Sequence, residues 1–150
     1  MSEEDLNSVV EFTNRILELS GLNLRASLET REAEARIQVR GDDVSMLLGH
    51  NAELLDTLEY LGNRLHTKQT GEESRIVFDS GNYRARREKE LQLMAEKAAE
   101  RVRSSRVPFI FDAMNPHERR IIHLTLAQDS TVRTESQGSG ENRKVTVYPA

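Results

Sequence analysis

The sequence predicts an α+β protein of two small domains, residues 1–80 and 81–150. Three observations lead to this prediction. First, hydrophobic residues recur with a helical period in some segments and with a period of two in others. Second, these segments form two sets separated by the turn Ser80-Gly81-Asn82, which is too short to be a flexible linker. Third, the sets differ in charge, because residues 1–80 hold 8 Lys/Arg and 16 Asp/Glu whereas residues 81–150 hold 13 and 9.

The first domain is predicted to contain a helix, two strands, two helices and a final strand, in that order. Apolar residues recur at helical spacing in the first segment, which ends at Gly21. Apolar and polar residues alternate in the next two segments, as in a hairpin with one buried face. A stripe of leucines marks the long helix that follows, and Gly49 separates a short helical turn from it. The predicted elements are a helix at 4–20, strands at 22–29 and 35–41, helices within 43–66 and a strand at 74–80.

The second domain is predicted to contain two helices and a three-stranded sheet. Its first helix is long and highly charged, with an apolar side that includes Leu91 and Met94. Its second helix begins after Asn115, a residue type that caps helices, and has Pro116 in the first turn. The last two strands flank a turn that contains glycine. The predicted elements are helices at 83–103 and 115–128 and strands at 107–111, 131–136 and 143–149.

Composition and charge exclude several classes of function. The chain has no cysteine, which excludes disulfides and thiolate metal sites. No segment approaches the roughly 20 apolar residues that span a bilayer, and the acidic N-terminus lacks the pattern of a secretory signal. We therefore expect a cytoplasmic protein with no membrane insertion, cofactor or metal. The basic second domain predicts a polyanion partner such as RNA or DNA, and ordinary surface variation is the alternative.

The stretch NPHERRIIHLTL, residues 115–126, places Arg119 and His123 four residues apart on the second helix of that domain. At ~100° per residue they lie one above the other, with Arg120 beside them, opposite an apolar side that includes Leu124. A guanidinium and an imidazole so placed can bind one phosphate, or the imidazole can stack on a base. The alternative is a solvated helix face on which Arg119 pairs with an acidic residue.

The sequence contains no recognisable catalytic motif. The segment HERRIIH resembles a zinc-protease motif only superficially, because His117 and His123 are six residues apart. They therefore lie ~120° apart around the helix and cannot share a metal ion. No serine–histidine–aspartate order, glycine-rich phosphate loop or close acidic pair stands out. We therefore predict a binding protein rather than an enzyme.

Further residues are predicted to support binding. The first turns of the 83–103 helix are basic and begin with Tyr83, which either forms a stacking platform for bases or packs across the domain junction. The turn Gly138–Lys144 is a candidate flank of the site. Tyr60 is expected to cover a helix edge, half-exposed. The predicted supporting cations are Arg84, Arg86, Arg87 and Lys89, together with Arg120.

Two regions resemble known domain families. The run MNPHERRIIHLTLAQDSTVRTESQGSGENRKVTV closely resembles the R-3-H domain, which is named for an arginine and a histidine separated by three residues. The run FDSGNYRARREKELQLMAEKAAERV resembles the helix that opens that domain, and residues 33–66 resemble a bacterial KH domain. Together they resemble the KH plus R-3-H pair of the bacterial Jag (KhpB-type) family over nearly the whole chain. Members of that family usually have an additional N-terminal domain, which we expect this chain to lack.

The resemblance implies binding of single-stranded nucleic acid, with Arg119 and His123 as the paired motif residues. It also implies an RNA-chaperone or post-transcriptional regulatory role, a small single-KH-domain partner, and a link to cell elongation and envelope growth. The predicted order of elements in the first domain agrees with the type II KH arrangement. RNA and DNA remain alternatives, because a reader of the 2′-hydroxyl has no sequence signature here.

The loop that would contact nucleic acid in a KH domain departs from the usual pattern. A GxxG loop lets the main chain approach the phosphates, and basic residues within it neutralise them. Here the loop reads Gly49-His50-Asn51-Ala52. Either this loop, His50 included, still contacts phosphate or a base, or the first domain serves self-association or partner docking. The alternative function for the chain is therefore a protein-interaction adaptor or dimerisation module with weak nucleic-acid binding.

Overall fold

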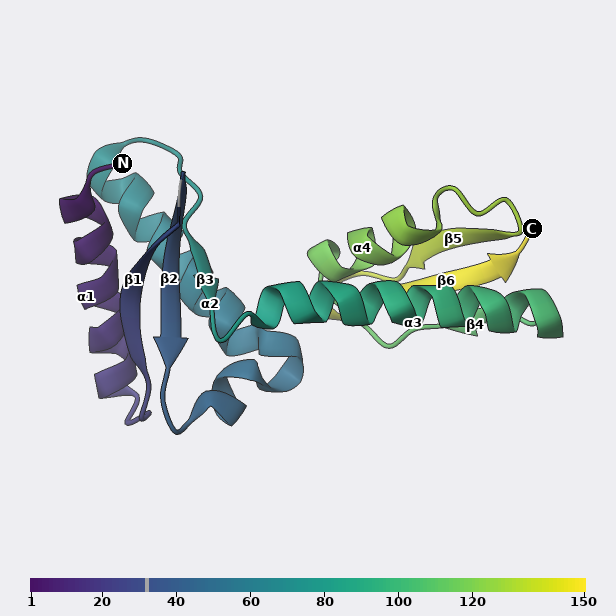
Figure 1. Cartoon of the computed structure of the whole chain (residues 1–150), viewed down its shortest axis with the longest axis horizontal. Helices are drawn as coiled ribbons and strands as arrows, with labels where there is room; N and C mark the ends of the chain where they lie inside the picture. The colour runs from purple at the N-terminus through teal and green to yellow at the C-terminus, as the bar shows by residue number, and fades with distance from the viewer. Residues whose placement is uncertain (32) are drawn as a thin grey trace. The chain divides into compact units, whose positions relative to one another are not determined.

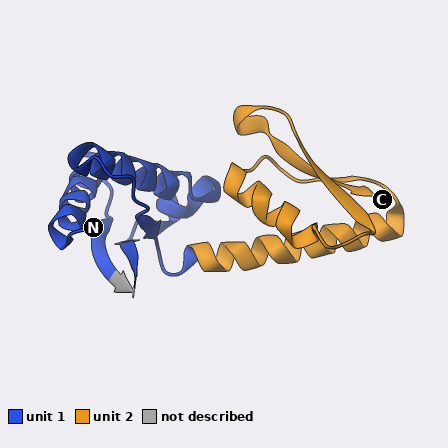
Figure 2. Ribbon diagram, turned by 90° about the horizontal axis from the view of Figure 1, so that it is seen from above, with its two compact units in different colours: residues 1–83 blue, residues 84–150 orange. Residues whose placement is uncertain are grey.

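The structure, a computed structural model, describes residues 1–31 and 33–150. The chain forms two compact units, residues 1–83 and 84–150 (Figure 2). The domain boundary predicted from the sequence, after residue 80, lies close to this division. The α+β class is confirmed, because the chain forms α-helices and two separate three-stranded sheets (Figure 1).

The first unit consists of two helices beside a three-stranded sheet (Figure 1). A capping box formed by Ser2 and Asp5 starts the first helix. The sheet has the order β1-β2-β3, with β1 and β2 antiparallel and β2 and β3 parallel. The elements are α1 (Glu3–Leu19), β1 (Arg25–Arg31), β2 (Glu34–Arg40), α2 (Val44–Thr70) and β3 (Val77–Asp79).

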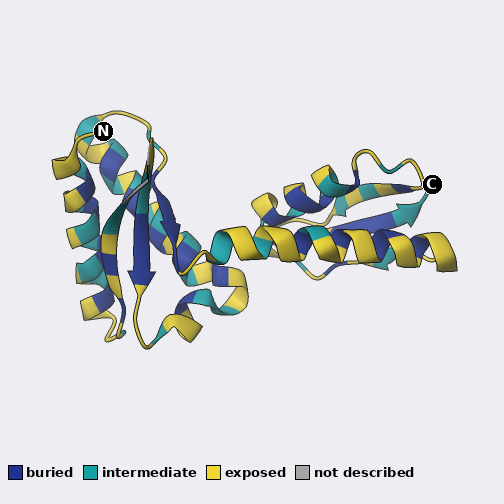
Figure 3. Ribbon diagram, viewed as in Figure 1, coloured by how far each residue is buried: buried dark blue, intermediate teal, exposed yellow. Residues whose placement is uncertain are grey.

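Both helices of the first unit cover the same face of its sheet. Alternate strand residues such as Ile37 and Val39 point into the core, where α1 contributes Val9 and α2 contributes Leu55. The packing is close enough to require a glycine on α2, because a Cβ at Gly62 would lie 2.7 Å from the buried ring of Phe78. Figure 3 shows buried and exposed residues interspersed along the helices, whereas the three residues of β3 are all buried.

The α2 segment is two helices joined by a break at residues 49–52, as the sequence predicted at Gly49. After Gly49, the next three residues have left-handed backbone angles, with φ of 52° at His50, 57° at Asn51 and 61° at Ala52. A residue with a Cβ pays about 1–2 kcal/mol for this conformation, so the loop is strained. Ala52 is fully buried in the core, whereas His50 and Asn51 are exposed.

The second unit packs two helices on one face of an antiparallel sheet of order β4-β6-β5. Its core contains Leu91 and Ala95 from the first helix, Ile122 from the second, and Val145 and Val147 from the central strand. The elements are α3 (Tyr83–Ser105), β4 (Phe109–Ile110), α4 (Pro116–Leu126), β5 (Val132–Gln137), the 3-10 turn η1 (Gly140–Asn142) and β6 (Lys144–Pro149).

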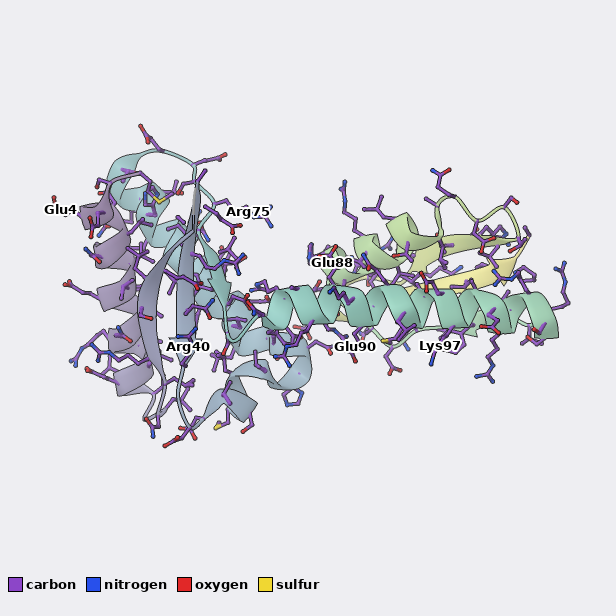
Figure 4. The ribbon with its side chains drawn as sticks, viewed as in Figure 1. Glu4, Arg40, Arg75, Glu88, Glu90 and Lys97 are labelled. Atoms are coloured by element: carbon purple, nitrogen blue, oxygen red, sulfur yellow. The ribbon has the colours of Figure 1, made fainter. Side chains whose placement is uncertain are left out.

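Two apolar side chains of the second unit do not lie where the helical period placed them. Met94 on α3 and Leu124 on α4 are exposed, at 36% and 61% of their maximal area. The buried arc of α4 is centred between Ile121 and Ile122, and Leu124 falls outside it. Charged side chains of α3, including Glu90 and Lys97, also project away from the helix (Figure 4). In the described part of the chain, no helix is both long and apolar enough to cross a membrane.

Candidate nucleic-acid interface

The start of α4 is fixed by the residues that the sequence indicated. The Asn115 side chain accepts a hydrogen bond from the backbone N–H of Glu118 at 2.8 Å, so Asn115 is the N-cap. Pro116 occupies the first turn, where its missing N–H costs nothing. This cap sets the rotation of the helix, and therefore the direction in which Arg119 and His123 leave it.

Arg119 is anchored through one of its nitrogens only. Its Nη1 donates to the Met114 backbone oxygen at 2.6 Å. The structure gives the guanidinium no other hydrogen bond or ion pair to a described residue. Because a guanidinium carries five N–H donors in a planar fork, the side chain is held in place and still has donors for an acceptor outside the protein.

His123 bridges α4 and β5 through both of its ring nitrogens. Nδ1 lies 2.7 Å from Oγ1 of Thr134, and Nε2 lies 2.7 Å from Oγ of Ser136. Partial burial of the ring, and then the charges of Arg119 and Arg143, lower the pKa of His123 below its ordinary value. The imidazole is therefore neutral at neutral pH, so one nitrogen donates to a hydroxyl and the other accepts from one.

This bonding changes what His123 offers. The spacing predicts that Arg119 and His123 lie together on one exposed face and can act on one group. The electrostatic effect of Arg119 on His123 supports their closeness, but both nitrogens of the ring are already hydrogen-bonded within the protein. His123 instead fixes the positions of two hydroxyls of β5.

Arg143 brings a second cation to this group. It comes from the turn that the sequence marked as a flank, residues 138–144, and its Nη1 donates to the Gly138 backbone oxygen at 2.7 Å. Its charge acts on His123, as that of Arg119 does. Among the described residues no carboxylate forms an ion pair with Arg119, Arg120 or Arg143. We refer to Arg119, Arg143, His123, Thr134 and Ser136 as the Arg–His cluster.

Three members of the Arg–His cluster were missed or only loosely indicated by the sequence. Thr134 and Ser136 are two residues apart on β5, so their side chains share the face that α4 covers. The signal was present in VRTESQ, where two hydroxyl residues alternate with charged ones, but nothing in the sequence pairs that strand with α4. Arg143 was included only as part of a range.

The basic residues at the start of α3 differ in their contacts. Arg87 donates from Nε to Oε1 of Glu118 at 2.8 Å, and its Nη1 lies 3.2 Å from Glu90. Glu118 is only 4% exposed, so Arg87 neutralises a buried carboxylate and ties α3 to α4. Arg86 and Lys89 are exposed and Arg84 is half-buried, and their contribution to binding stays a prediction.

The aromatic and loop candidates lie in the first unit. Tyr83 is half-buried and packs against the core of that unit, and its stacking on a base stays a prediction. Tyr60 is 63% exposed, more than a residue covering a helix edge would be. The loop Gly49-His50-Asn51-Ala52 exposes only its two central residues, neither of them Lys or Arg. Within residues 1–31 and 33–150, no group of three or more potential ligands could hold a metal ion.

Comparison with known proteins places the second unit in a domain family. Residues 89–149 match the R-3-H domain. Three relatives share the name RNA-binding protein KhpB. The one from Clostridium symbiosum is 32% identical over 143 residues, covering 94% of this chain and 64% of that protein. The one from Bacillus subtilis strain 168 is 28% identical over 123 residues, covering 81% and 59%, and that from Streptococcus pneumoniae strain D39 is 22% identical over 145 residues, covering 97% and 44%.

The match extends over both units of this chain but not over the whole of its relatives. The chain spans less than two thirds of the length of each of these KhpB proteins. The matched R-3-H segment contains α4, β5, β6 and the turn before β6, and thus every residue of the Arg–His cluster. Residues 89–149 are therefore an R-3-H domain, and the chain is similar to the KhpB (Jag) proteins over most of its length.

Proposed function

We propose that this chain binds single-stranded nucleic acid, RNA in the first place, through the Arg–His cluster of its R-3-H domain, and that it does so without catalysis. The observation that carries the proposal is that Arg119 and Arg143 form no ion pair with a described carboxylate and that both act electrostatically on His123. The name that the relatives share, RNA-binding protein, supports the same conclusion.

The chemistry of the cluster suits a phosphodiester. Arg119 offers a guanidinium fork that can bind two phosphate oxygens, and Arg143 adds a second positive charge. Of the Thr134 and Ser136 hydroxyls, the one that accepts from the imidazole keeps its hydrogen and can donate to a phosphate oxygen, whereas the one that donates to the imidazole can only accept, from a sugar hydroxyl or a base. His123 acts through them, because it fixes their positions by its two hydrogen bonds. Arg120, exposed on the neighbouring part of α4, adds to the positive potential, as do Arg86 and Lys89, which are exposed at the start of α3.

For the first unit we propose a KH-like fold of type II with a minor share in RNA binding. Its order of elements supports the fold: helix, two strands, a broken helix and a strand, with β2 and β3 parallel. Its acidic charge, 8 Lys/Arg against 16 Asp/Glu, and the loop without Lys or Arg oppose a strong grip on phosphate. The unit then serves self-association or the docking of a small single-KH-domain protein.

The family resemblance extends this proposal to the cell. We place the protein in the cytoplasm, with an RNA-chaperone or post-transcriptional regulatory role linked to cell elongation and envelope growth. In the competing proposal the chain is a protein-interaction adaptor. The two differ in salt dependence, because RNA binding through several cations weakens steeply as salt rises, whereas a packed protein interface need not weaken.

The test is a fluorescence-anisotropy titration of single-stranded RNA, single-stranded DNA and duplex at two salt concentrations. The Arg119→Ala/Arg143→Ala variant removes the two cations of the cluster. The Arg64→Ala/Arg75→Ala variant is the matched control, since it removes the same charge from exposed positions of the first unit. Circular dichroism verifies that both variants are folded.

We expect single strands to bind better than duplex and the cluster variant to bind about tenfold more weakly or worse. Its log–log salt slope should be shallower by about 1.4, because each lost phosphate contact on a single strand removes about 0.7. The control variant should bind within about twofold of the native chain. Equal losses in both variants, or binding that does not respond to salt, would refute the cluster as the site.

A further inference from the structure

The second sheet has an outer face that its helices do not cover. Val132, Val145 and Val147 point toward α3 and α4, so the alternate residues of the strands point away from them. Side chains on this outer face are exposed on β5, at Arg133, Glu135 and Gln137. The antiparallel register places Tyr148 of β6 opposite Arg133, and Lys144 opposite Gln137.

An arginine and a tyrosine on this face are already stacked. The Arg133 guanidinium lies over the Tyr148 ring, with its carbon 4.2 Å from the ring centroid. The Gln137 amide donates to the Tyr148 hydroxyl at 3.0 Å, and Glu135 pairs with Arg133. We call this stacked pair the Arg133–Tyr148 platform. Glu135 holds its arginine and Gln137 holds its tyrosine, and 54% of the Arg133 side chain remains exposed. Guanidinium planes and aromatic rings are the protein surfaces on which unstacked bases stack.

The outer face continues from the Arg–His cluster around one end of the sheet. Lys144 is the first residue of β6, and Arg143 directly precedes it. Arg143 acts on His123 on the side of α4, whereas Lys144 lies opposite Gln137 on the outer face. Lys144 thus lies at one end of the paired strands β5 and β6, and the stacked Arg133 and Tyr148 lie toward the other end of the same face.

We infer that single-stranded nucleic acid bound at the Arg–His cluster continues around the 138–144 turn onto the outer face of the sheet, where one of its bases stacks on the Arg133–Tyr148 platform. The inference rests on the proposed function and adds a second contact surface to it. Charge favours nucleic acid over a protein partner, because the described residues of β5 and β6 on this face include the cations Arg133 and Lys144 and a single carboxylate, Glu135, which is paired with Arg133.

The test uses the full chain and two labelled RNA strands, of about 4 and about 12 nucleotides, the longer one able to reach both surfaces. The Arg133→Gln/Tyr148→Val variant removes the platform while keeping a strand-forming residue at 148. The Lys97→Gln variant is the control, an exposed cation of α3 in the same unit. We expect the platform variant to bind the longer strand about fivefold more weakly or worse, and the shorter strand within about twofold of the native chain.

A direct readout of stacking is available because the chain has three tyrosines and no tryptophan. In the Tyr60→Phe/Tyr83→Phe variant, Tyr148 is the sole tyrosine, and stacking of a base should quench its fluorescence when the longer strand binds. The shorter strand should leave the emission nearly unchanged.

The outcomes separate this inference from the proposed function. If neither strand binds the native chain, the proposed function fails, and the inference fails with it. If both strands bind but the platform variant is unaffected and Tyr148 is not quenched, the Arg–His cluster stands and the outer face is not a nucleic-acid surface. A platform variant with native RNA binding and altered sedimentation would assign the face to protein contacts, which also overturns the inference.

Discussion

His123 is the residue whose contacts most change the interpretation of the motif. Two hydroxyls of β5 occupy its ring nitrogens, and two arginines lie close enough to lower its pKa. A neutral imidazole that is hydrogen-bonded at both nitrogens is a positioning group that links α4 to β5. In the proposed interface, phosphate binding therefore falls to the arginines, with His123 as a positioning residue.

A dependence of stability on pH follows from the lowered pKa of His123. In the unfolded chain the imidazole has its ordinary pKa of 6.5, whereas in the folded chain burial and the neighbouring arginines lower it. The unfolded state therefore takes up the proton first, and stability is lost as the pH falls through 6.5 toward the folded pKa. Urea denaturation of the native chain and of His123→Gln, between about pH 8 and pH 5, measures this loss.

Glutamine at position 123 can still bond to a hydroxyl but does not titrate, so the variant isolates the histidine from the carboxylates. We expect the native chain to lose stability relative to His123→Gln as the pH falls. Parallel pH profiles for the two proteins would show that His123 is not the titrating group.

The candidate site could be predicted only where its geometry is local. Arg119, His123 and the Asn115 cap belong to one helix, and their spacing fixes their placement. Thr134, Ser136 and Arg143 join them through the packing of β5 and β6 on α4, which no local pattern encodes. The exposure of Leu124 was missed for a related reason, because the width of a buried arc depends on what packs against the helix.

At the scale of elements, the ion pair between Arg87 and Glu118 joins the two helices of the R-3-H domain. The sequence grouped Arg87 with three other cations as a supporting contact for nucleic acid. Its partner Glu118 is buried, which makes this pair structural and separates Arg87 from exposed neighbours such as Arg86.

We predict that Arg87→Ala destabilises the second unit by about 3 kcal/mol, because it leaves the Glu118 carboxylate buried without its cation. Arg86→Ala removes the same charge from an exposed position and should change the free energy of unfolding by less than about 0.5 kcal/mol. Urea denaturation followed by circular dichroism measures both variants. Similar stabilities for the two would show that the pair contributes little to the fold.

Most elements could be predicted from periodicity, and the exceptions have a common cause. The segment SRIVFDS was predicted to be a strand at 74–80, but β3 spans Val77–Asp79, where it pairs with three residues of β2. The predicted strand at 107–111 is likewise reduced to Phe109–Ile110. A run of apolar residues indicates that a segment is buried, whereas the length of a strand depends on the neighbouring strand with which it pairs.

At the scale of the whole molecule, the chain has two hydrophobic cores that share no residue. Leu55 is fully buried in the first and Ile122 in the second. The units also differ in charge, because acidic residues outnumber basic ones in the first and basic residues outnumber acidic ones in the second. Each unit thus has its own source of stability and its own electrostatic character.

We predict that Leu55→Ala and Ile122→Ala each destabilise one unit by about 2–5 kcal/mol, the cost of a cavity in a packed core. Amide hydrogen exchange, measured residue by residue, should show faster exchange in residues 1–83 for the first variant and in 84–150 for the second. Uniform acceleration across the chain in either variant would mean that the units unfold as one.

The strained loop at residues 49–52 belongs to a unit with its own core. Three left-handed residues without glycine persist there at a cost in local energy, and the described core of that unit shares no residue with the core of the R-3-H domain. The energy stored in this loop is therefore borne by the first unit alone, and relief of the strain should leave the stability of the R-3-H domain unchanged.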